Sequence, residues 1–284
     1  MVSDAERLAQ WRTIGSRHSE EVIEIAPRVL ARSTDQEWAV REQLVIAALD
    51  VGRIELASEQ IDILEKKFPA SPRVLLLKGL RLEAEDQPVA AKKVYMAVLA
   101  TDETNVTAHQ RLIAVSLSTT DVPTTIPVLL TYLDNFYSDP SAWSLLADLY
   151  CRVQMYAQAL TAMGHLMLLQ SWDSNAVTKA GEIAYTMKDY PLSLKYFLRA
   201  VEMENGPRGS APSESTKAWW GVKQCAGKLL EEGETLTTVV PDSMSTTPDQ
   251  LKALDLLATE RLLAIGGNDM ESRRKILGEE IIVR

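Results

Sequence analysis

Residues 140–173 read PSAWSLLADLYCRVQMYAQALTAMGHLMLLQSWD, and this stretch decides the fold of the chain. Its first half places the large Trp143 and Leu146 before the small Ala147. In its second half the small Ala159 lies four residues before the large Met163, so that both side chains share one face of a helix. Small residues let two backbones approach, and large residues fill the groove beside them. The stretch therefore predicts two antiparallel helices packed on each other.

The same pattern recurs with a period of 34 residues along the chain. Five units lie end to end, and in each the twentieth position is small and the twenty-fourth is large and apolar. A helix pair repeated in this way predicts a solenoid, in which each unit packs on its neighbours. The units are 38–71, 72–105, 106–139, 140–173 and 174–207; the twentieth positions are Ala57, Ala91, Thr125, Ala159 and Ser193, and the twenty-fourth are Ile61, Tyr95, Leu129, Met163 and Phe197.

The eighth position of the unit, where the two helices cross closest, varies along the chain. It is small in three units, as Gly79, Ala147 and Gly181, but large in the first and third, as Val45 and Ile113. The signature is thus degraded in those two units. Period and residue types together are typical of the tetratricopeptide repeat (TPR). We expect an all-α TPR solenoid of antiparallel helix pairs with capping helices at both ends.

The flanks of the repeats carry the patterns expected of caps. Two helical patterns precede the first unit, and Ala218-Trp219-Trp220-Gly221 restores the start of a sixth unit after a stretch rich in Gly, Pro and Ser. The charged end of the chain is interpreted either as a mobile tail or as a segment docked on a partner. The expected regions are N-terminal capping helices in 1–37; a loop, a partial sixth repeat and a C-terminal capping helix in 208–267; and the charged tail, 268–284. The N-terminal capping helices are expected at 4–14 and 19–32, and the C-terminal one at 248–265. The exposed loop begins at the end of the fifth unit and is expected at 205–215.

Composition limits the compartment and the partners. The chain has 46% hydrophobic residues and a formal charge of −9, which opposes binding to nucleic acid or to an anionic membrane surface. Its two cysteines, Cys151 and Cys225, predict small apolar residues in a reducing compartment. No apolar run reaches the length of a membrane span, and the first twelve residues lack a secretory signal. We expect a cytoplasmic protein.

Motifs for catalysis or for a cofactor do not occur in the sequence. There is no phosphate-binding loop, no dinucleotide fingerprint and no metal-ligand spacing of His or Cys residues. His165, between Met163 and Met167, is interpreted as a packing residue rather than a metal ligand. The sequence predicts a protein that is not an enzyme and that has no cofactor.

Partner binding is expected on the first helix of each unit, which lines the groove of such a solenoid. The N-terminal half of this groove is apolar, which indicates either a bound partner segment or a cover formed by the N-terminal caps. The Lys and Asn side chains that would clamp an acidic carboxyl terminus are absent from the fifth and ninth positions. The expected partner-binding residues are Ile46, Leu49, Leu76, Leu80, Ser144, Asp148, Thr178, Glu182 and Tyr185.

Three stretches resemble one family in particular. They are Phe68-Pro69-Ala70-Ser71-Pro72-Arg73-Val74, the segment 132–150, and the segment 196–221 that ends in Trp219-Trp220-Gly221. In their spacing they are similar to subunit 2 of the endoplasmic reticulum (ER) membrane protein complex. The chain departs from that family at Asp102-Glu103-Thr104-Asn105, and in a longer loop near residue 205 that is rich in Gly and Pro.

The resemblance implies a non-catalytic scaffold on the cytoplasmic face of the ER membrane. Such a subunit has no span of its own, and it holds cytosolic segments of membrane subunits and a soluble cytosolic subunit. The resemblance also implies that the complex inserts tail-anchored and multi-pass proteins into the membrane. The alternative is a free cytosolic TPR adaptor or co-chaperone that is not attached to a membrane complex.

Overall fold

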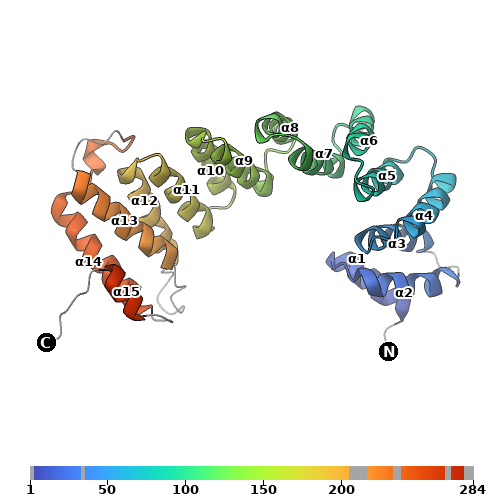
Figure 1. Ribbon diagram of the computed structural model, residues 1–284, viewed down its shortest axis with the longest axis horizontal. Helices are drawn as coiled ribbons and strands as arrows, with labels where there is room; N and C mark the ends of the chain where they lie inside the picture. The colour runs from blue at the N-terminus through green and yellow to red at the C-terminus, as the bar shows by residue number, and fades with distance from the viewer. Residues whose placement is uncertain (1–2, 33–35, 205–215, 233–237, 266–269, 278–284) are drawn as a thin grey trace. The chain divides into compact units, whose positions relative to one another are not determined.

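The computed structural model describes residues 3–32, 36–204, 216–232, 238–265 and 270–277. These residues form α-helices joined by short turns, with no strand among them (Figure 1). The prediction of an all-α fold is therefore confirmed. The loop expected at 205–215 lies outside the described residues, as do the start and the last seven residues of the tail.

The chain divides into two compact units, Met1–Asn135 and Phe136–Arg284. In the N-terminal unit, consecutive helices pack on each other as antiparallel pairs (Figure 1). Its helices are α1 (Asp4–Ile14), α2 (Ser19–Leu30), α3 (Glu37–Asp50), α4 (Ile54–Lys67), α5 (Pro72–Ala84), α6 (Pro88–Thr101), α7 (Val106–Thr119) and α8 (Val122–Asn135).

The C-terminal unit continues the same alternation of first and second helices. A short 3-10 helix, η2 (Asp242–Met244), precedes its penultimate α-helix. The α-helices of this unit are α9 (Pro140–Arg152), α10 (Tyr156–Leu169), α11 (Ser174–Thr186), α12 (Tyr190–Glu204), α13 (Thr216–Glu232), α14 (Pro248–Ala264) and α15 (Met270–Leu277).

Polar side chains and prolines fix where the first helices begin. Asn105 accepts a hydrogen bond from the backbone N–H of Ala108, and Asp139 and Asp173 cap α9 and α11 in the same way. Asn105 and Asp173 each satisfy one backbone donor that the first turn of a helix leaves unpaired, and Asp139 satisfies two. Pro140 adds a fixed φ at the first helical position. These residues set the start of the third, fourth and fifth units.

The turn between the two helices of a unit uses a left-handed residue at its fifteenth position. Gly52, Asp86, Gln154 and Lys188 have φ values of 76°, 57°, 60° and 65°. Only the first is a glycine, and a left-handed conformation costs other L-residues about 1–2 kcal/mol. The three turns without glycine are therefore stabilised by the packing of the helices that they join.

Within a unit, the close approach of the helices depends on a missing side chain. A Cβ atom built on Gly79 would overlap the ring of Tyr95, and one on Gly181 would lie 3.0 Å from the ring of Phe197. Tyr95 is fully buried and Phe197 nearly so. The small eighth position and the large twenty-fourth position thus pack directly on each other, as the repeat pattern predicts.

The third unit departs from this geometry. Its fifteenth residue, Thr120, is extended, with φ −129° and ψ 164°, and its eighth, Ile113, carries a large side chain. A cleft of about 450 Å³, lined in part by Leu99, Leu112 and Val128, lies beside this helix pair. In the third unit the degraded signature therefore corresponds to a more open helix pair, whereas α3 and α4 of the first unit pack closely despite Val45.

The C-terminal helices belong to the core of their unit. Ala218, Val222, Leu251 and Ala258 of α13 and α14 are buried in one cluster with Phe197. Part of the expected mobile tail is instead helical, because Met270–Leu277 forms α15. Leu277 is buried, and Arg273 of the same helix donates to the carbonyl of Leu262. Among the described residues, no helix is both long and apolar enough to cross a membrane.

Candidate functional site

The expected apolar groove residues of the N-terminal unit lie on α3 and α5. Ile46, Leu49 and Leu80 are half-buried and pack at the edge of the cluster formed by α3, α4 and α5. Part of the surface of each of these side chains remains accessible to solvent. These three positions stay candidates for partner binding.

Leu76 is placed differently from the prediction. It is only 9% exposed and belongs to the core cluster that includes Tyr95, Ala108 and Val115. Because Ala108 and Val115 lie on α7, the next first helix covers the fifth position of this unit. The prediction that Leu76 faces an open groove is therefore wrong, and Leu76 is a core residue.

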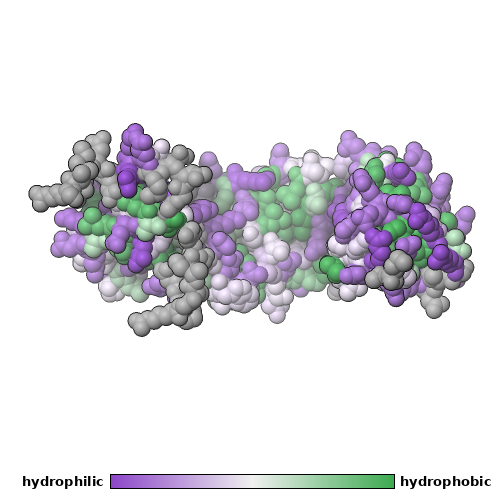
Figure 2. Space-filling model, turned by 90° about the horizontal axis from the view of Figure 1, so that it is seen from below, coloured by the Kyte–Doolittle hydropathy of each residue, from purple (hydrophilic) through white to green (hydrophobic). Residues whose placement is uncertain are grey.

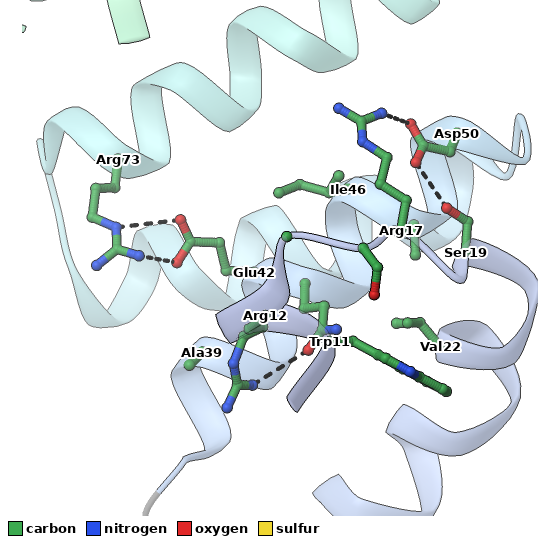
Figure 3. Close-up of a pocket in the computed structure, with 14 residues that line it drawn as sticks. Trp11, Arg12, Arg17, Ser19, Val22, Ala39, Glu42, Ile46, Asp50 and Arg73 are labelled. Atoms are coloured by element: carbon green, nitrogen blue, oxygen red, sulfur yellow. Dashed lines mark hydrogen bonds and ion pairs between the residues drawn. The ribbon is translucent and has the colours of Figure 1, made fainter. Parts of the chain in front are cut away.

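Ile46 lies on the floor of a cleft of about 310 Å³ that we call the cap cleft (Figure 3). The capping helices α1 and α2, the turn between them, α3 and Arg73 of α5 form its walls. The caps thus cover part of α3 but leave this cleft open. Its lining residues are Trp11, Arg12, Gly15, Ser16, Arg17, Ser19, Val22, Ala39, Glu42, Gln43, Ile46, Ala47, Asp50 and Arg73.

Ion pairs join the walls of the cap cleft (Figure 3). Arg73 donates to both carboxylate oxygens of Glu42, at 3.2 and 2.6 Å. Asp50 accepts from Arg17 at 2.7 Å and from the hydroxyl of Ser19 at 2.8 Å. These contacts tie α5 and the α1–α2 turn to α3.

The two expected acidic groove residues of the C-terminal unit are paired with lysines. Asp148 lies 2.6 Å from the ammonium group of Lys179, and Glu182 lies 2.6 Å from that of Lys217. Each pair joins a first helix to the next one, α9 to α11 and α11 to α13. The carboxylates therefore help to align neighbouring units, although such exposed pairs are worth less than about 1 kcal/mol each.

Thr178 and Ser144, the expected polar groove residues, have different environments. Thr178 is only 4% exposed, and its hydroxyl donates to the carbonyl of Ser174 in its own helix. The prediction that it faces a partner is wrong. Ser144 is partly exposed and lines a cleft with Gln170 and Asp173.

Tyr185 and Glu182 line another cleft, of about 430 Å³, between α11 and α13, which we call the α11–α13 cleft. Phe197, Trp220 and Gly221 also contribute to its lining. Tyr185 packs against Tyr190, with 5.1 Å between ring centroids, and burial raises the pKa of its hydroxyl. This aromatic cleft offers apolar contact area on the same helices that carry the Glu182 ion pair.

Sequence reasoning missed the arginines of the cap cleft. Arg12 and Arg17 lie outside the repeats, so no repeat position pointed to them. Arg73 does lie in the Phe-Pro-x-Ser-x-Arg-Val stretch that carries the family resemblance. This arginine is not part of the repeat consensus, and it is the one feature of the sequence that could have pointed to the cleft. Its partner Glu42 occupies a groove position of the preceding unit.

The remaining sequence candidates have packing roles. His165 stacks on Trp143 with ring centroids 4.2 Å apart. Cys225 is buried beside Ser193, and Cys151 is half-buried. No group of three or more metal-binding side chains occurs in the ranges that the structure describes. The surface features found are clefts and ion pairs, which suit the binding of another chain.

The fold and these clefts define the class of the protein: a TPR-type helical-repeat protein, a class that presents extended surfaces to other chains. Residues 61–195 match the family described as EMC2 TPR-like repeat domain. ER membrane protein complex subunit 2 of Xenopus tropicalis is 29% identical over 279 residues, covering 88% of this chain and 94% of the relative. The TPR repeat protein oca3 of Schizosaccharomyces pombe is 31% identical over 211 residues, 72% of each chain. The chain belongs to the family of ER membrane protein complex subunit 2.

A solved structure supports the fold. The C-terminal part of a TPR repeat-containing protein from Cytophaga hutchinsonii matches with a TM-score of 0.62 at 14% identity. The match covers 91% of this chain and 95% of that one. At this identity the likeness concerns the fold alone.

Proposed function

We propose that this chain is a non-catalytic scaffold subunit of an ER membrane protein complex. It lies on the cytoplasmic face of the membrane and holds cytosolic segments of the membrane subunits together with a soluble subunit. The complex inserts tail-anchored and multi-pass proteins. The observation that carries the proposal is the similarity to subunit 2 over 88% of this chain and 94% of the relative.

The surface of the first helices supports this role. Ile46, Leu49 and Leu80 present partly exposed apolar side chains, and the cap cleft and the α11–α13 cleft open beside first helices. In the space-filling view, apolar residues show between the hydrophilic residues of the N-terminal unit (Figure 2). A scaffold needs several such contacts, because each bound segment buries only a small area.

The test is co-purification with the tagged chain from membranes solubilised in a mild detergent. The wild-type chain is expected to bring integral ER membrane proteins with it in stoichiometric amounts. Ile46→Glu places a charge on the floor of the cap cleft and is expected to lose at least one of them. Val89→Glu is the matched control, because Val89 is 69% exposed on α6 and does not line the cap cleft.

The two outcomes separate the scaffold from the free adaptor. Recovery of the chain alone, or with soluble chaperones only, would contradict the scaffold proposal and support the free TPR adaptor. Equal recovery with both variants would leave the scaffold role in place and remove Ile46 from the partner site. Melting curves of both variants show whether a loss reflects unfolding.

A further inference from the structure

We propose that the cap cleft binds an acidic segment of a partner protein, in which an Asp or Glu carboxylate lies beside a large apolar side chain. This inference rests on the proposed scaffold function and specifies the chemistry of one bound segment. It comes from the charges, the exposure and the floor of the cleft.

The charge of the cap cleft is opposite to that of the whole chain. Its lining holds three arginines, Arg12, Arg17 and Arg73, and two carboxylates, Glu42 and Asp50. The cleft therefore has an excess of positive charge in a chain whose formal charge is −9. Such a local excess attracts a negatively charged segment and disfavours a basic one.

The exposure of these side chains places the positive charges on the outside. Arg17 and Arg73 are 72% and 76% exposed, whereas their partners Asp50 and Glu42 are each 26% exposed. An incoming segment thus meets the guanidinium groups first. The carboxylates remain behind them as internal partners.

The arginines keep donors for a further acceptor. A guanidinium has five N–H donors, and the pairs described above use one from Arg17 and two from Arg73. Among the residues that the structure describes, Arg12 donates to the amide oxygens of Gln36 and Gln43, at 2.6 and 3.4 Å. The Arg12 guanidinium is partly buried and is also attracted by the Glu42 carboxylate, but its hydrogen bonds go to neutral oxygens, so an anionic acceptor would strengthen them.

The floor of the cleft is apolar. Trp11, Val22, Ala39, Ile46 and Ala47 line it, and the volume of about 310 Å³ accommodates a large side chain. A segment that carries only acidic residues would leave this floor uncovered. A large apolar side chain next to the carboxylate fills it.

The α11–α13 cleft shows that this preference is local. Its only charged lining residues among those described are Glu182 and Lys217, which pair with each other at 2.6 Å. That cleft is neutral and aromatic. We therefore assign acidic segments to the cap cleft alone.

The direct test measures fluorescence anisotropy with two labelled synthetic peptides and the full-length chain. One peptide alternates acidic residues with Leu, and its match carries Lys at every acidic position. The acidic peptide is expected to bind about tenfold more tightly, and to weaken as NaCl rises from about 50 to 300 mM. Equal affinity for the two peptides, or no binding of the acidic one, overturns the proposal.

Variants locate the binding. Arg17→Gln/Arg73→Gln is expected to weaken binding of the acidic peptide about tenfold, since it removes two charged donors whose exposed ion pairs contribute less than about 1 kcal/mol each to folding. Arg28→Gln/Arg199→Gln is the matched control, because these arginines are also exposed and paired but lie outside the cleft. Equal loss in both double variants overturns the assignment to the cap cleft.

A photocrosslinking residue at Gln43 separates this inference from the scaffold proposal. In the native complex it is expected to crosslink a partner segment of net negative charge that contains a large apolar residue. If membrane subunits co-purify but the crosslinked segment is basic or neutral, or the product is a lipid, the inference fails and the scaffold stands. If none co-purify, the scaffold proposal fails, and the peptide measurement decides the inference alone.

Discussion

The ring of Phe197 occupies the space that a side chain at Gly221 would need, since a Cβ atom built there would lie 2.5 Å from three of its ring carbons. Phe197 is the large residue of the fifth unit, and Gly221 lies in the next first helix, α13. The same ring packs against Gly181 of its own unit. One aromatic ring therefore sets the distance both within a unit and between two units.

Gly221→Ala is expected to destabilise the protein, because the buried Phe197 ring must move to admit a methyl group. Overpacking of this kind costs about 1–3 kcal/mol in the free energy of unfolding. Urea denaturation followed by circular dichroism measures the change. Gly227→Ala, in the same helix but with nothing within 4 Å of the new Cβ, is the control and is expected to stabilise by up to about 1 kcal/mol. Equal effects at both glycines would contradict the packing account.

The left-handed turns predict a stabilising substitution. Lys188→Gly is expected to raise the free energy of unfolding by up to about 1 kcal/mol, because glycine adopts the φ of 65° found there without steric cost. Thr120→Gly is the control: residue 120 is extended, with φ −129°, so the glycine adds freedom to the unfolded chain and removes the hydroxyl that donates to the carbonyl of Ser116. Chemical denaturation is expected to change in opposite directions for the two variants.

Glu83 links three helices, and its neutralisation is expected to destabilise the N-terminal unit. Its carboxylate accepts from the hydroxyl of Tyr95 on α6 and from the guanidinium of Arg111 on α7. Glu83→Gln weakens both contacts and is expected to lower the free energy of unfolding by about 1–3 kcal/mol. Glu59→Gln, on the exposed side of α4, is expected to change it by less than about 0.5 kcal/mol. A similar small effect at Glu83 would show that the network adds little.

Cys225 predicts a loss of stability at alkaline pH. Burial raises the pKa of its thiol from 9.0 to about 12. Between these values the unfolded chain loses the thiol proton while the folded chain keeps it, so the free energy of unfolding falls as pH rises, by up to about 1.4 kcal/mol per pH unit. Measurements between pH 9 and 10 are expected to show a shallower decline in Cys225→Ala. An unchanged slope in that variant would assign the alkaline sensitivity to other groups.

The periodic part of the structure could be predicted because each unit specifies its own packing. The small twentieth and large twenty-fourth positions identified buried residues such as Ala57, Ile61, Ala159 and Met163. The first capping helix begins and ends at Asp4 and Ile14, as its sequence pattern predicts. These features depend on contacts within a helix pair, which a 34-residue pattern records.

Side-chain exposure along the first helices could not be predicted in the same way. Whether a fifth-position residue faces solvent depends on how the next first helix covers it, and Leu76 is covered by α7. The pairing of Asp148 with Lys179 likewise requires the spacing between neighbouring units. The helix α15 has few apolar residues, so its sequence pattern is that of a charged tail. Its place in the core depends on Leu277, which is buried.

The most direct test of the central claim is the size of the particle that contains the native, tagged chain in a mild-detergent extract of membranes. The scaffold account predicts that the chain elutes wholly in one large particle, with integral ER membrane proteins at fixed stoichiometry. Elution of most of the chain near its own mass of 31.5 kDa, free of membrane proteins, would contradict the account.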